Sequence, residues 1–218
     1  ARARETGAPV VLTAAPRAAR RRRGAPDVLA ALAAAPHPNV VRIHAAGASS
    51  GYPYLVMELC TGGDLKGRVR QGPLAPEEAA RIVAEVARGV AHIHAKGVIH
   101  RDLKPENVMF DDQGRARVTD FGLARVSGAE ALTRTVTLLG TPAYMAPEQV
   151  DGRDVDTRAD VWALGGILLT TLTGHPPYEG ATPLNILAKL TRQDPRWPCE
   201  DRPETPLALD AIVRRAMA

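Results

Sequence analysis

Four short blocks, in one order along the middle of the chain, limit its possible folds more than any other feature. They are residues 100–107 (HRDLKPEN), 120–122 (DFG), 140–148 (GTPAYMAPE) and 160–165 (DVWALG). A lone Asp-Phe-Gly triplet is too short to be informative, but four blocks in this order and at these spacings are specific. The last block opens the apolar stretch 161–172, which predicts a buried core helix.

The side chains in these blocks suit the transfer of a phosphoryl group to a hydroxyl. That reaction needs a carboxylate near the hydroxyl, oxygen ligands for Mg²⁺ and positive charge near the moving group. Asp102 can be the carboxylate, and Lys104 can reach the same phosphate as a point charge. Asn107 offers a neutral oxygen to a metal ion, and Asp120 can hold Mg²⁺ between phosphates. Taken singly, these residues could be turn residues, so the prediction depends on their occurring together.

Together the blocks resemble the catalytic loop, metal-binding motif, activation-segment end and central helix of eukaryotic-type (Hanks-type) protein serine/threonine kinases. The resemblance extends upstream to residues 37–41 (HPNVV) and covers nearly the whole chain. It implies an α+β, two-lobed kinase-like fold with a partial, β-rich N-lobe and a mainly helical C-lobe. It also implies transfer of the γ-phosphoryl group of ATP, with Mg²⁺, to Ser or Thr hydroxyls of protein substrates.

The resemblance assigns a role to each matching residue. Asp102 would be the catalytic base, Lys104 the phosphate contact, and Asn107 and Asp120 the Mg²⁺ ligands. Asp160 would brace the catalytic-loop backbone, and His100 is interpreted as a packed structural histidine. The residues expected around the nucleotide are Met57 as gatekeeper, Glu58 and Cys60 with backbone hydrogen bonds to adenine, Asp64 at the ribose, Met109 beneath adenine, and Glu106.

Control by phosphorylation is a further implication of the resemblance. Arg101, just before the expected base, can pair with a phosphate on the activation segment. The regulatory candidates in that segment are Thr133, Thr135, Thr137 and Thr141, with Ser127 a weaker one. An unmodified loop explains the same threonines, so the sequence leaves both interpretations open.

The N-terminal part departs from the family pattern. No glycine-rich phosphate loop is present, and Thr13 stands where the family has a lysine. Asp27 is the nearest acid to the expected helix glutamate. Towards the other end, the Arg that pairs with Glu148 in the family is expected after the helix 207–217 and does not follow it. We therefore expect a fragment that is truncated at both ends.

The missing lysine bears on activity. Removing one preorganised charge typically lowers a rate about 10²–10³-fold, which predicts a weak enzyme unless Arg17 or a neighbour replaces it. The alternative is a pseudokinase, a scaffold module favoured by Thr13 and opposed by the intact Asp102, Asn107 and Asp120. A small-molecule phosphotransferase of related fold is a third hypothesis. The extended segment that ends in Ala-Pro-Glu argues against it.

The composition is that of a globular domain, with 45% apolar and 24% charged residues. The net charge of +4 is compatible with binding a polyphosphate. The run 20–23 (RRRR) lacks interleaved aromatic residues, so it indicates a solvated loop and no nucleic-acid partner.

Cys60 and Cys199 form no metal or disulfide pattern, which favours a reducing, cytoplasmic setting. No apolar run reaches the roughly 18 residues of a membrane span, and the Arg- and Ala-rich composition suggests a bacterial source.

Hydrophobic periodicity predicts the order of the elements. We expect strands at 10–12, 40–43 and 53–59 with a turn at 47–51, helices at 27–35, 76–95, 161–172 and 207–217, and short strands at 108–110 and 117–119. The change from strands to helices predicts a hinge at 60–64. The partial N-lobe would then span 1–59, and the C-lobe 65–218 would be incomplete at its C-terminal end.

Overall fold

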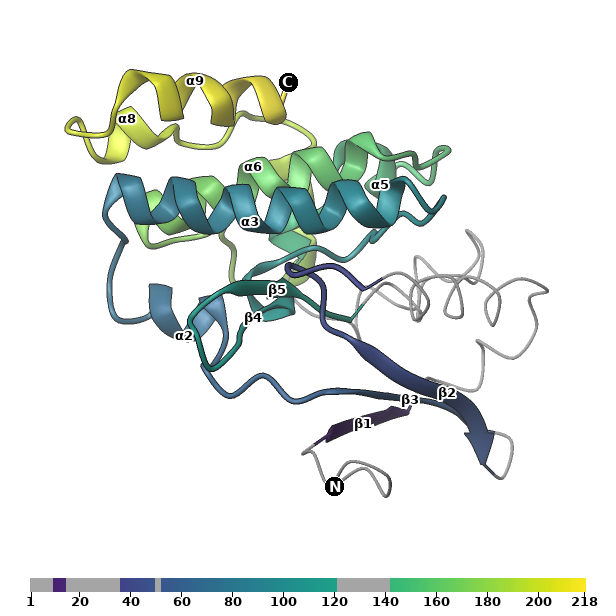
Figure 1. Cartoon of the computed structure of the whole chain (residues 1–218). Helices are drawn as coiled ribbons and strands as arrows, with labels where there is room; N and C mark the ends of the chain where they lie inside the picture. Colours follow the sequence, from purple (N-terminus) through teal and green to yellow (C-terminus); the bar gives the residue numbers. More distant parts are fainter. Residues whose placement is uncertain (1–9, 15–35, 50–51, 121–141) are drawn as a thin grey trace.

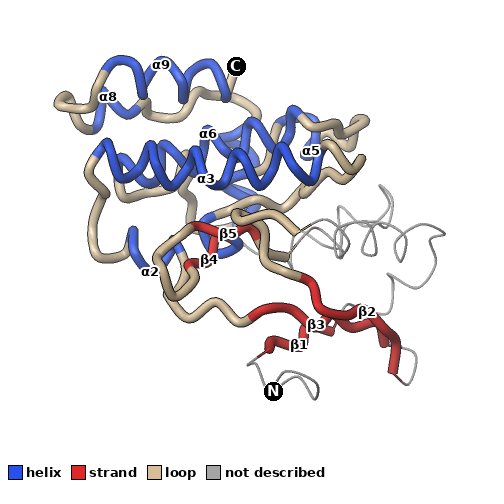
Figure 2. The backbone as a smooth tube through the Cα atoms, in the orientation of Figure 1, coloured by secondary structure: helices blue, strands red, loops and turns tan. Residues whose placement is uncertain are grey.

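The computed structural model describes residues 10–14, 36–49, 52–120 and 142–218. In Figure 1 the long helices lie on one side of the molecule and a small sheet lies on the other. Figure 2 shows the same division by colour, with the longer strands in red away from the main helical layer in blue. This is the two-lobed α+β arrangement that the sequence predicts, with strands first along the chain and helices after them.

The small sheet has three antiparallel strands in the order β1-β3-β2. Their bounds are β1 Val10–Ala14, β2 Ile43–Ser49 and β3 Tyr52–Glu58. Thr13 lies opposite Leu55, and Ile43 lies opposite Met57. Because Ile43, Leu55 and Met57 are buried in the hydrophobic core, they anchor the sheet to the rest of the molecule. The strand expected at 10–12 is confirmed.

The strand expected at 40–43 is wrong in its position. Val40 and Val41 lie beside Val118, from the other part of the chain, and strand β2 begins only at Ile43. The N–H of Val41 donates to the Val118 carbonyl at 2.9 Å, and the N–H of Val118 donates to the Asn39 carbonyl at 2.9 Å. An apolar run cannot distinguish these partners, because its side chains are buried against either of them.

Other expected bounds shift by smaller amounts. The turn expected at 47–51 is wrong at its start, because Gly47 lies within β2, where a Cβ would meet the Tyr54 hydroxyl oxygen at 2.6 Å. The strand expected at 53–59 spans 52–58. The two short strands are β4 Val108–Phe110 and β5 Ala116–Val118, paired antiparallel around a turn that contains Gly114.

Helix α3, Pro76–His94, confirms the clearest helical prediction. It has Pro at its start and Glu77 and Glu78 in its first turn, where carboxylates complement the positive helix end. Its buried residues recur at three- and four-residue steps and form one apolar stripe, which consists of Ala79, Ile82, Val83, Val86, Gly89, Val90 and Ile93. Gly97, at a φ of 73°, ends the helical turn.

Helix α6, Arg158–Thr173, lies beside α3 in the middle of the helical layer (Figure 1). It is buried on nearly every side, as its continuous apolar run predicts, and α9, Leu207–Ala216, packs on its other side. Four short helices were not predicted, because each is only one or two turns long: α2 Leu65–Val69, α5 Pro147–Val150, α7 Pro183–Leu190 and α8 Pro198–Asp201. No helix in the described part of the chain is long and apolar enough to cross a membrane.

Several sequence predictions fall outside the described residues. These are the helix at 27–35, the arginine run 20–23, Arg17, Asp27, Ser127, Thr133, Thr135, Thr137 and Thr141. They stay predictions.

Candidate active site

The catalytic-loop block lies between α3 and β4 and brings its three polar side chains together. The Lys104 ammonium nitrogen lies 2.8 Å from Asp102 Oδ2. Asn107, at the end of the 3₁₀ turn η2 (Pro105–Asn107), donates from Nδ2 to the Asp102 carbonyl at 2.8 Å and faces Asp102 Oδ2 at 3.4 Å. The Asp102 side chain is 31% exposed. Its carboxylate is therefore oriented by neighbours and still reachable from outside.

Asp160 holds the backbone just before Asp102, as the sequence predicts. It belongs to α6 and is almost fully buried, and its carboxylate accepts from the N–H groups of His100 and Arg101, both at 2.8 Å. Arg101 has a φ of 65°, in the left-handed region that costs a non-glycine residue about 1–2 kcal/mol. The paired amide hydrogen bonds offset this strain. His94, at the end of α3, adds a contact of 2.7 Å from Nε2 to Asp160 Oδ2. No sequence signal marked His94, because its partner is distant in the chain.

His100 is a structural histidine, in agreement with the interpretation from sequence. The ring is fully buried. Its Nδ1 accepts from the N–H of Asp102 at 3.3 Å, and its Nε2 lies 2.9 Å from the Thr119 carbonyl, to which it donates. Burial lowers the pKa of His100, although the Asp160 carboxylate acts in the opposite direction. The ring is thus neutral and links the catalytic loop to the residue after β5.

The two metal-ligand candidates come from adjacent strand ends. Asn107 immediately precedes β4, and Asp120 is separated from the end of β5 by one residue, Thr119. The N–H of Thr119 donates to the Asn107 carbonyl at 3.0 Å, which joins the two segments directly. Asp120 is exposed and has a φ of 57°, another non-glycine residue in the left-handed region. Phe121 and Gly122 lie outside the described residues.

The residues expected around a nucleotide occupy the connection between sheet and helices. Met57 is buried in β3, and Cys60 is buried just beyond it. Burial, and secondly the nearby Glu58 carboxylate, raise the pKa of the Cys60 thiol to about 11. Asp64 caps α2 by accepting from the Gly67 N–H at 2.6 Å, which leaves only part of its carboxylate for another partner.

Two more residues of that set are placed by other contacts. Met109, in β4, is half-buried and pairs with Asp64 through an isolated β-bridge, so these two candidates lie side by side. Glu106 forms an ion pair of 2.6 Å with Lys66 of α2. Its carboxylate therefore faces helix α2.

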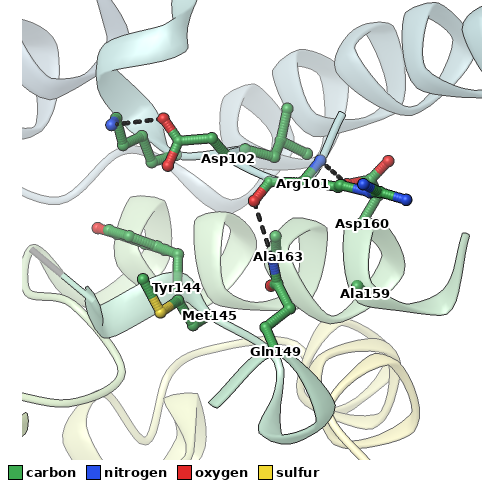
Figure 3. A pocket seen from close by; sticks show the side chains of 10 residues that line it. Arg101, Asp102, Tyr144, Met145, Gln149, Ala159, Asp160 and Ala163 are labelled. Carbon is green, nitrogen blue, oxygen red and sulfur yellow. Dashed lines mark hydrogen bonds and ion pairs between the residues drawn. The ribbon is translucent and has the colours of Figure 1, made fainter. Parts of the chain in front are cut away.

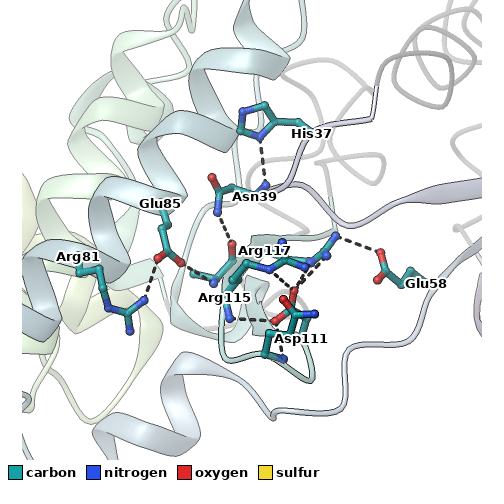
Figure 4. Close-up of polar contacts among 10 residues, drawn as sticks. His37, Asn39, Glu58, Arg81, Glu85, Asp111, Arg115 and Arg117 are labelled. Carbon is teal, nitrogen blue, oxygen red and sulfur yellow. Dashed lines mark hydrogen bonds and ion pairs between the residues drawn. The ribbon is translucent and has the colours of Figure 1, made fainter.

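An ion-pair network ties the end of β3 to β5 (Figure 4). The Arg117 guanidinium lies 3.1 Å from Glu58 Oε2 and 3.0 Å from Asp111 Oδ2. Arg115 contributes a second guanidinium at 2.8 Å from Asp111 Oδ2. The Glu58 side chain is engaged by Arg117, while its backbone is the group expected to meet adenine. The sequence did not reveal this network, because Glu58 and Arg117 are far apart in the chain.

A small pocket lies beside the catalytic loop (Figure 3). It is lined on one side by Asp102 and on the other by Tyr144 and Met145, from the end of the activation segment, and by Gln149, which follows that segment. Lys104, which contacts Asp102, also lines the pocket. The Tyr144 hydroxyl lies 3.2 Å from the Thr170 hydroxyl of α6, which fixes this wall against the central helix. The structure therefore places the third sequence block directly against the first.

Comparison with known proteins agrees with this geometry. The family model described as protein kinase domain matches residues 17–206. The chain is 38% identical over 192 residues to the serine/threonine-protein kinase PknB of Mycobacterium leprae. The matched region covers 85% of this chain and 31% of that protein. It is 37% identical over 193 residues to PknB of Mycolicibacterium smegmatis, with 85% and 31% covered.

A third relative comes from another bacterial group. The probable serine/threonine-protein kinase PknB of Lactococcus lactis is 38% identical over 189 residues, which cover 86% of this chain and 30% of that protein. The chain thus spans about a third of the length of the curated relatives it matches. On the match of the family model and on these identities, the chain belongs to the protein kinase domain family.

Proposed function

We propose that this chain is the catalytic domain of a protein serine/threonine kinase, which transfers the γ-phosphoryl group of ATP to hydroxyl side chains of proteins. The observation that carries the proposal is the Asp102 carboxylate, partly exposed and held by Lys104 at 2.8 Å and by Asn107. The names of the bacterial relatives support the serine/threonine class and protein substrates.

The proposed reaction uses these side chains in a definite way. Asp102 accepts a hydrogen bond from the substrate hydroxyl and takes its proton as the new O–P bond forms. The bond between the γ-phosphorus and the bridging oxygen breaks, and ADP leaves with that electron pair. Lys104, already beside Asp102, balances the negative charge on the moving phosphoryl group.

We propose that Asn107 and Asp120 hold Mg²⁺. The amide nitrogen of Asn107 is used on Asp102, so its amide oxygen remains as a ligand, and Asp120 adds an exposed carboxylate. Two protein oxygens suit Mg²⁺, which usually completes its shell with water and substrate phosphates. When bound, the ion neutralises phosphate charge. Within the described part of the chain no group of three or more His, Cys, Asp or Glu side chains could hold a metal ion, so this pair depends on phosphates and water for the remaining ligands.

We propose that residues 1–59 form the partial N-lobe, 60–64 the hinge and 65–218 the C-lobe. The nucleotide base is proposed to lie at the hinge between the two lobes. Burial of Met57 and Cys60 and the position of Met109 support an apolar adenine site there. Asp64 is proposed at the ribose through the part of its carboxylate that does not cap α2. Glu106 is proposed near the phosphates only if its ion pair with Lys66 opens. The free thiols of Cys60 and Cys199 and the use of ATP support a cytoplasmic location.

We also propose that phosphorylation of the activation segment regulates the kinase activity. Arg101 lies in the strained loop next to Asp102, so a phosphate that pairs with it would act directly on the catalytic loop. The candidate residues remain Thr133, Thr135, Thr137 and Thr141.

Thr13 is the residue that motivates the pseudokinase alternative. It lies in β1 opposite Leu55, and substitution by lysine tests its effect. If the lysine gap limits catalysis, Thr13→Lys raises the turnover rate about 10²–10³-fold, the usual effect of one preorganised charge.

The decisive experiment is a phosphoryl-transfer assay on the full-length protein. It would be incubated with γ-labelled ATP, Mg²⁺ and a generic basic protein, beside the variants Asp102→Asn and Asp112→Asn. Asp112 is exposed and outside the proposed site, so its variant controls for loss of a charge. We expect label with the unsubstituted protein and Asp112→Asn, and almost none with Asp102→Asn. Equal label with all three would refute the kinase proposal.

A further inference from the structure

Gln149 makes two hydrogen bonds that connect separate parts of the candidate site (Figure 3). Its side chain comes from α5 and is buried, with 8% of the residue exposed. Nε2 donates to the Arg101 carbonyl at 2.9 Å, and Oε1 accepts from the Ala146 N–H at 3.0 Å. A primary amide is suited to this place, because it offers a donor and an acceptor on one planar group.

The bond to Arg101 acts on the peptide that leads into Asp102. The carbonyl of that peptide is held by Gln149, and its N–H donates to His100 Nδ1 at 3.3 Å. On the other side of Asp102, the carbonyl is held by Asn107 at 2.8 Å. Both peptide planes next to the Asp102 Cα are therefore fixed, and with them the direction of the Cα–Cβ bond that carries the carboxylate.

Among these contacts, the bond from Gln149 is the one that comes from the segment after the activation segment. Asp160 holds the two N–H groups before this peptide, and it comes from the central helix. The strained φ of Arg101 makes the peptide prone to rotate when a contact is lost. Gln149 therefore restrains the Arg101–Asp102 peptide. Any rotation of that peptide would move Asp102.

The second bond links this peptide to the opposite wall of the pocket. Ala146 directly follows Tyr144 and Met145, which line the pocket across from Asp102. A displacement of that wall is transmitted through one rigid amide to the Arg101 carbonyl. A displacement of the Arg101 carbonyl is transmitted to the wall in the same way, because both hydrogen bonds are made by the Gln149 side chain.

We infer that Gln149 is a positioning residue that sets the orientation of the Asp102 carboxylate and couples it to the segment Pro142–Ala146. This inference rests on the kinase activity proposed above. A buried carbonyl that loses its donor is costly, and transfer rates are sensitive to small misplacements of a catalytic group. We expect Gln149→Met, which keeps the size and removes both bonds, to lower kcat about tenfold. The KM for ATP is expected to stay unchanged, because Gln149 is not among the residues expected at the nucleotide.

Gln149→Glu gives the sharper test, through its pH profile. A protonated carboxyl can donate to the Arg101 carbonyl and accept from the Ala146 N–H, as the amide does. The ionised form places a negative oxygen against the carbonyl, and burial raises the pKa of such a carboxyl. The ratio of its kcat to that of the unsubstituted protein should therefore approach one at pH 5.5 and fall about tenfold by pH 8.5. Gln149→Met should stay low throughout.

The matched control is Gln193→Glu, the same charge change at an exposed position. Its kcat should follow the unsubstituted protein at every pH. Amide hydrogen exchange, followed by mass spectrometry, supplies a readout independent of turnover. Exchange in residues 100–103 should rise in Gln149→Met and remain unchanged in Gln193→Glu.

Distinct results separate the possible failures. If Gln149→Met keeps its kcat, or if Gln149→Glu shows a pH-independent loss with a lowered Tm, Gln149 has only a structural role and the inference is overturned. If Gln149→Glu follows the unsubstituted protein across the pH range, the donor to Arg101 is unimportant and the inference also fails. If the unsubstituted protein transfers no phosphoryl group, the proposed function itself is refuted.

Discussion

Replacement of Asp111 by asparagine tests the ion-pair network at the turn between β4 and β5 (Figure 4). Asp111 is 5% exposed, and its Oδ1 accepts from the backbone N–H groups of Gln113 at 3.0 Å and Arg115 at 2.9 Å. Its Oδ2 accepts from the side chains of Arg115 at 2.8 Å and Arg117 at 3.1 Å. Burial alone would raise the pKa of Asp111, but these hydrogen bonds outweigh it and lower the pKa from 3.8 to about 2.

The sign of the pH dependence follows from that lowered pKa. Because the folded pKa lies below the unfolded one, the stabilisation is complete above about pH 4 and is lost as the pH falls towards 2. The difference between 3.8 and about 2 corresponds to about 2 kcal/mol in the free energy of unfolding. Integration of the same two values gives a loss of about 1 kcal/mol by pH 3.

Urea unfolding at pH 5 and pH 3, followed by tryptophan fluorescence, measures this effect. Asp111→Asn keeps an acceptor for the two backbone N–H groups but turns an amide donor towards the arginines. We expect it to lower the free energy of unfolding by about 2–3 kcal/mol at pH 5, and the gap to the unsubstituted protein to narrow by about 1 kcal/mol at pH 3. Asp112→Asn, at the exposed neighbour, should change little at either pH. A gap of constant size between the two pH values would refute the reasoning.

Three further predictions concern buried positions. Gly89→Ala should lower Tm in a thermal scan, because a Cβ there would overlap the Asn39 carbonyl oxygen, and this outweighs the gain of about 1 kcal/mol in helix propensity; a higher Tm would contradict it. Cys60, with a pKa of about 11, should react slowly with iodoacetamide at pH 8 and about tenfold faster per pH unit up to that value, as measured by mass spectrometry. Rapid labelling at pH 8 would be inconsistent with its burial. Asp160→Asn should lower the free energy of unfolding by about 2–4 kcal/mol in urea, since one buried acceptor becomes a donor that faces an N–H. A loss below 0.5 kcal/mol, the usual size of a surface substitution, would show that the brace is dispensable.

The amino-acid sequence alone was sufficient for the family and for the main helices. The order of the blocks around Asp102, Asp120 and Asp160 is that of protein kinases, and the family model agrees. Helix α3 was predictable because its apolar residues repeat with the helical period over many turns, so local pattern and burial coincide. The cluster of Asp102, Lys104 and Asn107 was predictable for a related reason: all three lie within one short segment.

Only the tertiary structure decided how that cluster is held. The bond from Gln149 to the Arg101 carbonyl and the ion pair of Arg117 with Glu58 join residues that are distant in sequence. The same holds for Val40, which lies ahead of β2 and pairs with Val118 of β5. Such contacts leave no periodic signal, because each depends on how whole elements pack against one another. Residue types and spacing determine which chemistry is possible, and the packing of α5 and α6 against the catalytic loop determines where its carboxylate points.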